Sequence, residues 1–461
     1  MSNNINSILH FIGIGGSGMT ALAEISIARG YTVSGSDITP SSKTKRLKKL
    51  GATIFYSHTP ENIPTSCTVI YSSAIDEQNV ELLTAKKRSL QVLHRSTYLA
   101  YLMQGKFAIT VAGTHGKTTT TALLFHVLKS LGRKPSVALG GDLIEFNSSS
   151  YTDSGDIFIA ETDESDGSLV AYQANIGILT DIGNDHLDFF YDLPSIKSTY
   201  SQYLNQIQPD GAAVTFWDSS HCREVSLTFS GNRMAYGSTI GTNSRLLSYR
   251  PYKGQTRIEA VIEHTKISCT LPLIGKHNAM NALATLSVVH LLGEDLRAAS
   301  NALSTFKGVE RRCHLLYSSP QLKIYDDYAH NPGKINACIK GLKDSWPTHH
   351  IITIFEPHRY SRLKTMYNEL LGSFCFSNQV FVTHIFSAGE NMSDNLSPET
   401  IASDIQRLSK TSATSIDLHE SHLELFMENL PETPTVLLTL GAGKINQVAK
   451  KMVELLNEEK K

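Results

Sequence analysis

The sequence has no excess of charge of either sign. Lysine and arginine together number 42 against 43 aspartate and glutamate residues in 461 positions, so the formal net charge is −1. A neutral balance does not suggest a surface for nucleic acid, although a local basic patch can exist on such a chain. An apolar fraction of 41% and a charged fraction of 18% are ordinary for a soluble globular protein, and this length allows about two to four domains.

Cysteine is sparse, and no two cysteines have CxxC spacing. A zinc cluster or disulfide framework is therefore not expected, and the pattern favours reduced thiols in a cytosolic protein. The first residues, MSNNINS, show no basic stretch followed by an apolar core, so no signal peptide is expected. No apolar run approaches the ~20 residues that span a bilayer. These absences predict a cytoplasmic protein without a membrane span.

Internal repeats and low-complexity segments are also missing. The chain instead alternates strand-like and helix-like segments, which predicts βαβ units around parallel sheets. A second α/β unit begins near Lys106 and a third near Leu315. Between them, residues 256–273 have an antiparallel, hairpin-like pattern, followed by a helix with an apolar face over 276–292.

A glycine-rich turn joins the strand that starts at Phe107 to a helix. It reads GTHGKT from Gly113 and departs from the general P-loop, because two residues instead of four separate its glycines. The backbone N–H groups of such a turn favour an anion. Lys117 adds a positive charge, and Thr118 adds a hydroxyl that can ligate Mg²⁺. The loop predicts an ATP site; the alternative is a turn that only caps a helix.

Two further strands end in polar clusters. The first cluster, ETDESD, runs from Glu161 to Asp166, and the second contains His186 and Asp188. In open parallel sheets the carboxyl ends of the strands meet at one rim, where ligands bind. Carboxylates are ligands that Mg²⁺ prefers. Either cluster alone could be a solvated loop, but three strand ends at one rim predict a metal–nucleotide site.

A second glycine-rich turn lies near the N-terminus. Residues Gly13 to Gly18 match G-x-G-x-x-G between a strand and a helix, and Asp37 follows 19 positions later. Alone, this pattern favours an NAD-dependent oxidoreductase, but any diphosphate can use such a turn. A hydride-transfer enzyme has no use for a GKT loop. An ATP-driven ligase with a nucleotide-linked substrate uses both; a non-catalytic nucleotide-binding regulator is a third alternative.

The motifs together resemble the Mur ligase family, the ATP-dependent amide-forming enzymes of peptidoglycan synthesis. The resemblance covers nearly the whole chain and rests on GTHGKTTT, ETDESD, DHLD, GKHNAMNALA, ERR and DDYAHNP, in that order. Within the family, the member that adds the first amino acid is the most similar, through HFIGIGGSGMTALAEI, YSSAI, HRSTYLAYLM and EPHRYSR. The implied fold is three α/β domains: a Rossmann-like UDP-substrate domain (1–104), a central P-loop-type ATPase domain (105–313) and a Rossmann-like, amino-acid-binding closing domain (314–461).

The resemblance implies a reaction in which ATP phosphorylates the carboxylate of UDP-N-acetylmuramate. The amine of L-alanine then attacks the acyl phosphate, and a tetrahedral intermediate releases phosphate. The expected substrates are therefore UDP-N-acetylmuramate, L-alanine and ATP, with Mg²⁺, in a cytoplasmic monomer or homodimer. The nearest rival is the family's recycling ligase, which adds a whole muramyl peptide to the same sugar nucleotide.

The resemblance also assigns roles to residues that handle the nucleotide. Lys117 would hold the β- and γ-phosphates, Thr118 and Glu161 would ligate one Mg²⁺, and His186 would hold a second metal. Asn278 and Asn281 would reach the adenine beside His277, Arg312 would contact phosphate, and Asp327 would accept the ribose hydroxyls. The expected nucleotide-binding set is Gly113, Thr114, Gly116, Lys117, Thr118, Thr119, Asn278, Asn281, Arg312 and Asp327. The expected catalytic set is Lys117, His186, His330 and Arg359.

Substrate contacts are implied as well. His330 would lie near the phosphates or the incoming amine, and Arg359 and Arg362 would face a carboxylate or phosphate. Asp37 and His58 would lie near the uridine. The expected substrate-binding set is Gly15, Gly16, Ser17, Gly18, Asp37, Ser72, Ser73, His94, Arg95, Asp163, Glu164, Ser165 and Arg362.

Three positions depart from the family pattern. Asn331 replaces a histidine near the expected amino-acid pocket, Asp181 replaces an asparagine, and Glu356 replaces a glutamine. These changes bear on the choice of amino acid more than on the type of reaction. An alanine pocket discriminates against glycine by one methyl group, worth only ~1–3 kcal/mol, so glycine or serine is an alternative substrate.

Overall fold

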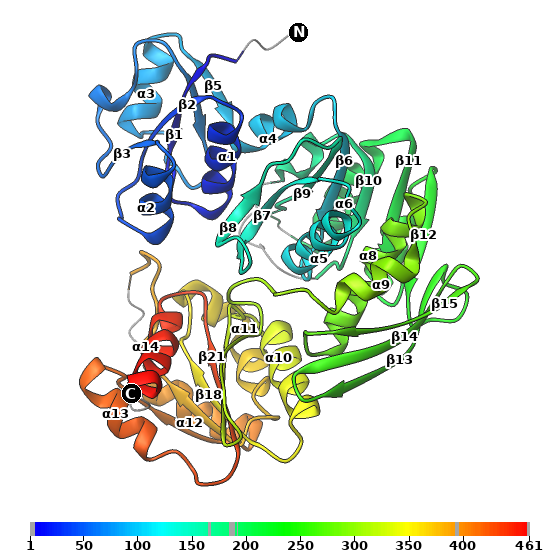
Figure 1. The fold of residues 1–461 in the computed structure, drawn as a ribbon. Helices are drawn as coiled ribbons and strands as arrows, with labels where there is room; N and C mark the ends of the chain where they lie inside the picture. The colour runs from blue at the N-terminus through cyan, green and yellow to red at the C-terminus, as the bar shows by residue number, and fades with distance from the viewer. Residues whose placement is uncertain (1–4, 165–166, 184–189, 191, 392–395, 459–461) are drawn as a thin grey trace. The chain divides into compact units, whose positions relative to one another are not determined.

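The computed structural model describes residues 5–164, 167–183, 190, 192–391 and 396–458, and it contains three β-sheets with helices between their strands (Figure 1). The chain divides into two compact units. The first comprises Met1–Leu247, Ala260–Ile267 and Met280–Lys307, and the second comprises Ser248–Glu259, Ser268–Ala279 and Gly308–Lys461. The predicted α/β class is confirmed, with three sheets where three α/β units were predicted.

The first sheet has five parallel strands in the order β3-β2-β1-β4-β5. Its strands are β1 (Ile8–Ile12), β2 (Thr32–Ser36), β3 (Thr53–Phe55), β4 (Thr68–Tyr71) and β5 (Gln91–His94). The intervening helices are α1 (Ser17–Ala28), α2 (Ser42–Lys49), η1 (Pro60–Asn62), α3 (Val80–Lys87) and α4 (Arg95–Met103). Strand β1 lies in the centre, so the first glycine-rich loop follows the middle of the sheet.

The second sheet has ten strands in the order β15-β14-β13-β12-β11-β10-β6-β9-β7-β8. They are β6 (Phe107–Ala112), β7 (Ser136–Leu143), β8 (Ser148–Tyr151), β9 (Ile157–Glu161), β10 (Ala174–Leu179), β11 (Ile207–Phe216), β12 (Asn232–Gly237), β13 (Ser244–Tyr252), β14 (Gln255–Ile262) and β15 (Thr265–Leu271). The helices are α5 (Lys117–Ser130), η2 (Ser168–Ala171), α6 (Leu193–Asn205), α7 (Ser220–Leu227), α8 (Lys276–Leu291) and α9 (Leu296–Leu303).

Two features of this sheet were predicted. Strand β6 lies between β9 and β10 and pairs in parallel with both, so the carboxyl ends of these three strands lie at one rim as expected. Strands β14 and β15 are neighbours joined by only two residues, a connection that antiparallel strands alone can use. The predicted hairpin and the helix after it are therefore confirmed.

The third sheet has six strands in the order β16-β17-β21-β18-β19-β20, parallel except for β16. Its strands are β16 (His314–Ser318), β17 (Leu322–Asp327), β18 (His350–Phe355), β19 (Gln379–Val382), β20 (Ser412–Ser415) and β21 (Thr435–Leu440). The helices are α10 (Pro332–Ser345), α11 (Tyr360–Gly372), α12 (Pro398–Ser409), α13 (Glu420–Glu428) and α14 (Ile445–Glu458).

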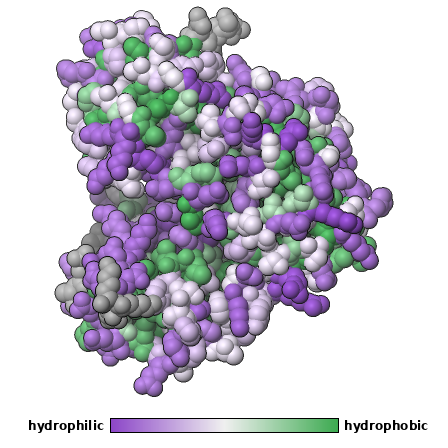
Figure 2. Space-filling model, viewed as in Figure 1, coloured by the Kyte–Doolittle hydropathy of each residue, from purple (hydrophilic) through white to green (hydrophobic). Residues whose placement is uncertain are grey.

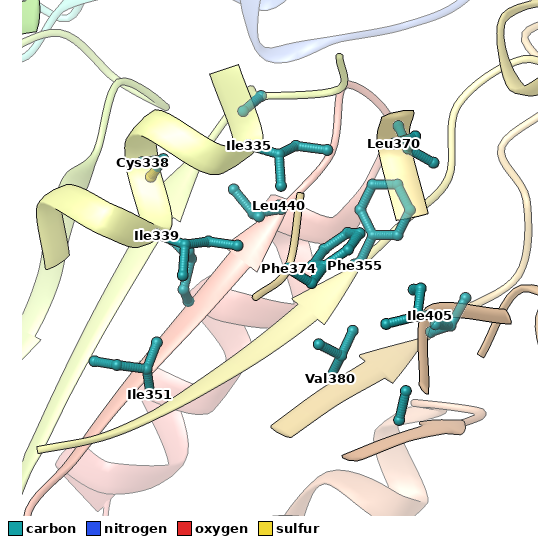
Figure 3. Close-up of a cluster of buried hydrophobic side chains, with 14 of the residues drawn as sticks. Ile335, Cys338, Ile339, Ile351, Phe355, Leu370, Phe374, Val380, Ile405 and Leu440 are labelled. Carbon is teal, nitrogen blue, oxygen red and sulfur yellow. The ribbon is translucent and has the colours of Figure 1, made fainter. Parts of the chain in front are cut away.

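A core of buried apolar side chains fixes the helices of this third sheet against its strands. Ile335 and Ile339 of α10 lie over β18 and β21, and Phe355 contacts Phe374 with ring centroids 5.1 Å apart (Figure 3). Burying one side chain of this size contributes roughly 1.5–3 kcal/mol. The core thereby holds the carboxyl ends of β17, β18 and β21, where the polar residues of the second unit gather.

The surface is mainly hydrophilic, and the cysteines are mostly buried. Hydrophilic side chains predominate on the face drawn in Figure 2, with small hydrophobic areas between them. All six cysteines are free thiols; five are buried and Cys375 is exposed. Among the described residues, no helix is both long and apolar enough to cross a membrane.

Candidate active-site residues

The loop between β6 and α5 has a backbone that only glycine suits at its two ends. Gly113 has a φ of 133°, and a Cβ there would lie 2.3 Å from Thr180 Oγ1. Gly116 has a φ of 84°, and a Cβ there would lie 2.6 Å from Asn281 Oδ1 of helix α8. Both positions are in a region that L side chains rarely adopt. The loop is thus packed closely and leads directly into the N-terminus of α5, a strand–turn–helix junction of the kind that favours an anion.

Lys117 begins helix α5 and is almost buried. Its Nζ donates to the Gly113 carbonyl oxygen at 2.5 Å and to Glu164 Oε1 at 2.8 Å. Burial disfavours the charged ammonium, but the carboxylates of Glu164, Glu161 and Asp163 outweigh it and raise the pKa of Lys117. The lysine therefore stays cationic at neutral pH, between the Gly113 carbonyl oxygen and the Glu164 carboxylate.

Thr118 and Glu161 meet as a pair of oxygen ligands. Thr118 Oγ1 donates to Glu161 Oε1 at 2.8 Å, and Glu161 Oε2 accepts from the Gly140 N–H at 2.6 Å. A hydroxyl and a carboxylate this close are hard oxygen donors, and the pair fits a Mg²⁺ ion. Within the described residues, no three His, Cys, Asp or Glu side chains form a metal-binding group. His186, Asp188 and Ser165 lie outside the described residues, so their predicted roles stay predictions.

A contact that the sequence did not reveal stabilises the phosphate loop. His115 Nδ1 forms a short hydrogen bond with Asp181 Oδ2, from the segment after β10. The Thr114 N–H donates to the Asp181 carbonyl oxygen at 3.0 Å, and Gly183 N–H donates to Thr114 Oγ1 at 2.9 Å. Asp181 is one of the three departures from the family pattern, and its partner here is the loop itself. Thr119, which follows Thr118 in helix α5 and was also predicted to bind the nucleotide, is buried with 8% of its surface exposed.

The first glycine-rich loop is arranged around Asp37. The Gly15 N–H donates to Asp37 Oδ2 at 2.9 Å, and a Cβ on Gly15 would lie only 2.7 Å from that oxygen. The Gly16 N–H closes a turn onto the Gly13 carbonyl oxygen at 3.1 Å, and Ser17 Oγ accepts from a lysine Nζ of α2. The structure thus places Asp37 directly against the first glycine-rich loop, and its predicted role near the uridine stays a prediction.

Arg95 connects this loop with the acidic segment after β9. Its Nη2 donates to Asp163 Oδ2 at 2.9 Å, and its Nη1 would lie 3.5 Å from a Cβ on Gly18. The next predicted pair is also in contact, since Ser73 Oγ and His94 Nε2 are 3.0 Å apart. The structure therefore brings together predicted substrate residues from both sheets of the first unit.

His58, predicted to lie near the uridine, contacts a buried carboxylate and a hydroxyl of its own sheet. Its Nδ1 lies 3.0 Å from Glu81 Oε2 and 3.0 Å from Ser36 Oγ. Glu81 is fully buried, and it also accepts from Asn62 Nδ2 at 2.7 Å. Burial raises the pKa of Glu81, but hydrogen bonds from His10, Ser36, Asn62 and His58 outweigh it and bring the pKa to about 2. Sequence analysis missed Glu81 because its helix carries no recognisable motif.

The second unit gathers its polar residues after β17. Asp327 accepts from the Cys313 N–H at 2.6 Å through Oδ2 and from the Ala329 N–H at 2.7 Å through Oδ1. Burial raises its pKa, and the positive charge of Arg312 opposes that rise. The guanidinium of Arg312 lies over the Tyr328 ring, 5.5 Å from the centroid. Asp327 is thereby held in one orientation, with Arg312 near it.

The predicted adenine residues lie in helix α8. Asn278 is 4% exposed and donates from Nδ2 to the Ile274 carbonyl oxygen at 2.8 Å. Asn281 is 6% exposed and contacts Gly116 of the phosphate loop. A Cβ on Gly275 would meet the His277 ring at 2.6 Å, so His277 folds back on the turn before the helix.

The hydrogen bond of His330 defines its tautomer. Its Nδ1 lies 2.8 Å from the Tyr328 carbonyl oxygen, which can only accept, so Nδ1 carries the proton in the neutral ring. Burial lowers the pKa of His330 well below its usual value, and the nearby charges of Lys334 and Arg362 lower it further. The ring is therefore neutral at pH 7, with Nε2 as the unprotonated nitrogen.

The residues after β18 surround a second histidine. His358 stacks on Phe386 with ring centroids 5.5 Å apart, and its Nδ1 lies 2.8 Å from Arg362 Nη1. Burial, followed by the charges of Arg362 and Arg359, lowers the pKa of His358 to about 4. His330 is 5.7 Å from His358 between centroids. Predicted residues His330 and Arg362 therefore share one group with a histidine that was not predicted.

Arg359 is oriented by a carboxylate that sequence analysis also missed. Its Nε donates to Glu390 Oε1 at 2.6 Å, and Glu390 further accepts from the Ser361 N–H and hydroxyl. Arg359 has a φ of 65° where it caps α11, and its N–H donates to the Phe386 carbonyl oxygen at 2.9 Å. The carboxylate comes from a loop far along the chain, so no local pattern could have identified it.

The other two departures each have a local structural role. Asn331 is the N-cap of α10, where its Oδ1 accepts from the Lys334 N–H at 3.0 Å. Glu356 accepts from the N–H groups of Lys444 and Ile445 at the start of α14, at 3.1 and 3.3 Å. A carboxylate is stabilised at a helix N-terminus.

Comparison with known proteins gives a consistent result along the chain. Three family profiles match: "Mur ligase family, catalytic domain" over residues 8–107, "Mur ligase middle domain" over 111–289 and "Mur ligase, glutamate ligase domain" over 311–443. A curated UDP-N-acetylmuramate–L-alanine ligase from Carboxydothermus hydrogenoformans is 36% identical over 449 residues, 96% of each chain.

Two solved structures are similar over almost their full length. The UDP-N-acetylmuramate-alanine ligase from Thermotoga maritima has a TM-score of 0.83 at 27% identity, covering 98% of this chain and 99% of that one. A murein peptide ligase from Psychrobacter arcticus has a TM-score of 0.70 at 20% identity, covering 97% and 98%. The second likeness concerns the fold alone.

Proposed function

We propose that this chain, which belongs to the Mur ligase family, is an ATP-dependent ligase that joins L-alanine to the carboxylate of UDP-N-acetylmuramate in peptidoglycan precursor synthesis. The similarity to ligases that carry this name supports the proposal. A carboxylate is a poor acyl donor. Converting it to an acyl phosphate provides a good leaving group and couples amide formation to ATP cleavage.

The observation that carries the proposal is the grouping around Lys117. A near-buried lysine, a Thr118–Glu161 oxygen pair and an anion-binding turn all lie at one rim of a parallel sheet. The Arg95–Asp163 contact connects this rim with a loop suited to a diphosphate. An oxidoreductase would need only the Gly13–Gly18 loop and would have no use for the Lys117 loop.

In the proposed reaction Lys117 binds the β- and γ-phosphates and stabilises the charge that develops on transfer. Thr118 and Glu161 would hold Mg²⁺, which would neutralise charge on phosphate oxygens when bound. Asp327 would accept the ribose hydroxyls, because both of its oxygens have further lone pairs beyond their backbone partners. Arg312 and Asn281 complete the proposed nucleotide contacts.

His330 would lie near the phosphates or the incoming amine. The neutral ring, with its proton on Nδ1, presents Nε2 as a hydrogen-bond acceptor for an N–H of the incoming amino group. Because burial lowers the pKa of His330 well below its usual value, the ring would orient the amine and is too weak a base to keep its proton. Arg359 and Arg362 would bind a substrate carboxylate or phosphate.

We further propose the domain boundaries 1–104, 105–313 and 314–461, a cytoplasmic location and a monomeric or homodimeric state. The first profile match ends at residue 107 and the third begins at residue 311, which supports the boundaries after 104 and 313. ATP and UDP-linked sugars are cytoplasmic substrates, which supports the location.

Phosphate release tests the proposal. The full chain is incubated with ATP, Mg²⁺ and UDP-N-acetylmuramate, and single amino acids and the muramyl tripeptide are compared as acceptors. Release that depends on L-alanine is the expected result. Release only with glycine or serine would keep the chemistry and change the specificity, release only with the tripeptide would favour the recycling reaction, and no release would contradict the ligase assignment.

A further inference from the structure

Helix α1, which begins in the first glycine-rich loop, carries a buried carboxylate that the proposed reaction does not use. Glu24 is 6% exposed. Its Oε1 accepts from Arg46 Nε at 2.5 Å, and its Oε2 accepts from Ser148 Oγ at 2.6 Å and Ser150 Oγ at 2.8 Å. Burying a carboxylate costs free energy of folding unless both of its oxygens accept hydrogen bonds. Here the donors come from helix α2, which packs with the first sheet, and from strand β8 of the second sheet.

Arg46 of α2 extends the same contact. Its Nη1 donates to the Asn147 carbonyl oxygen at 2.7 Å, and its Nη2 lies 3.4 Å from Asp142 Oδ1. Each of the three guanidinium nitrogens of Arg46 therefore contacts a different acceptor, and Glu24 is one of the three. The hairpin formed by β7 and β8 is held at its turn and on both strands by α1 and α2; this set of contacts is called the Glu24–Arg46 clamp below.

The same hairpin reaches the proposed metal carboxylate. The Gly140 N–H of β7 donates to Glu161 Oε2 at 2.6 Å, while Glu161 Oε1 accepts from Thr118. The parallel pairing of β7 with β9 runs from Ser136 to Ala138. Gly140 thus comes after the paired stretch and before Asp142, the residue that Arg46 contacts.

The irregular pairing of the β7–β8 hairpin leaves the stretch around Gly140 dependent on contacts from outside the hairpin. Pairing between β7 and β8 shifts irregularly between Ala138 and Leu143, the stretch that contains Gly140. A bulged segment is not held by a regular ladder on either side. Its position follows from the clamp at one end and from β9 at the other.

We infer that Glu24 and Arg46 are positioning residues for Mg²⁺ binding, because they hold the β7–β8 hairpin so that the Gly140 N–H fixes the orientation of Glu161. This inference rests on the proposed function, in which Glu161 is a magnesium ligand. A single set of contacts then joins α1, whose first turn belongs to the diphosphate loop, to the metal carboxylate. Neither residue touches the reacting atoms in this scheme.

The test measures how ADP binding to the full chain depends on Mg²⁺, by titration calorimetry, in the wild type and in Glu24→Gln. The expected result is a rise of at least about threefold in the Mg²⁺ concentration at half-saturation, with ADP binding without metal unchanged. Arg46→Lys keeps the charge but loses the planar fork, and it should show a smaller rise in the same direction. The exposed Glu61→Gln, in the same domain, is the matched control and should match the wild type.

Each outcome separates the possibilities. A lower unfolding temperature with an unchanged Mg²⁺ dependence in both clamp variants would make the clamp purely structural and overturn the inference. If Glu24→Gln does not fold, Arg46→Lys and Ser148→Ala give the same reading through milder changes. Glu161→Gln serves as the reference, because a wild-type Mg²⁺ dependence in that variant would contradict the metal assignment of the proposed function instead.

Discussion

Lys117 Nζ and Glu164 Oε1 lie 2.8 Å apart, with 14% and 4% of their side chains exposed, and so form an almost buried ion pair at the phosphate loop. We expect Lys117→Ala to abolish phosphate release, because no other cation of the loop would replace the proposed contact of Lys117 with the γ-phosphate. The same change should lower the free energy of unfolding by about 3–5 kcal/mol, since it leaves a buried carboxylate without its partner. Turnover and urea unfolding measure the two effects.

A second substitution separates these two roles. The double variant Lys117→Ala with Glu164→Gln removes both charges, so it should regain most of the lost stability and none of the turnover. Unchanged turnover in Lys117→Ala would sink the assignment of the ATP site, whatever the stability.

The buried Glu81 predicts a pH-dependent stability. Its folded pKa of about 2 lies below its usual value of 4.5, so its contribution is fully present above about pH 4.5 and is lost as the pH falls toward 2. Glu81→Gln should lower the free energy of unfolding by about 3 kcal/mol at neutral pH. The difference in free energy of unfolding between variant and wild type should shrink as the pH falls from about 4.5 to about 2. Urea unfolding over this range measures it; a gap that stays constant with pH would contradict the prediction, and Glu61→Gln is the control.

Glu390 should act through Arg359. In Glu390→Gln the guanidinium loses a charge-assisted hydrogen bond at Nε, and such bonds contribute roughly 1.5–3 kcal/mol. We expect kcat/KM to fall about 10- to 100-fold when it is measured well below the unfolding temperature of the variant, where the variant is still folded. The exposed Glu432→Gln in the same unit is the control. A wild-type kcat/KM in the folded variant, with only the unfolding temperature lowered, would show that Glu390 serves the fold instead of the arginine.

The Asn331 departure can be tested by restoring the family residue. Asn331→His removes the N-cap of α10, so the free energy of unfolding should fall by about 0.5–2 kcal/mol. Asn331→Asp keeps the cap and should be nearly neutral. If the Asn331 side chain serves mainly as a cap, the preference among alanine, glycine and serine stays the same in both variants. A changed preference measured by phosphate release would instead place this side chain in the amino-acid pocket.

Local patterns were sufficient to predict the fold. The glycine turns, strand alternation and helix at α8 depend on residues that are close in the chain, and each was found where expected. The same holds for the neighbourhood of Lys117, since β6, β9 and β10 are adjacent by the ordinary rule for parallel sheets. The spacing between the first glycine-rich turn and Asp37 was noted from the sequence, and the Gly15–Asp37 hydrogen bond itself came from the structure.

The missed residues share a different property. Glu24, Glu81 and Glu390 each gain their partners from segments far away in sequence, and each is a single carboxylate without a motif around it. His115 and Asp181 belong to two motifs that were both found, but their hydrogen bond depends on how two loops pack. Composition and periodicity do not contain that information.

The uneven burial of the cysteines has a practical consequence. Five thiols are inside the protein and Cys375, between α11 and β19, is exposed. A thiol-reactive fluorophore or spin label should therefore attach to the native chain at one position, with no cysteine first having to be removed. The wild-type protein thus offers a single spectroscopic reporter in the second unit, and Cys375→Ser supplies the unlabelled reference.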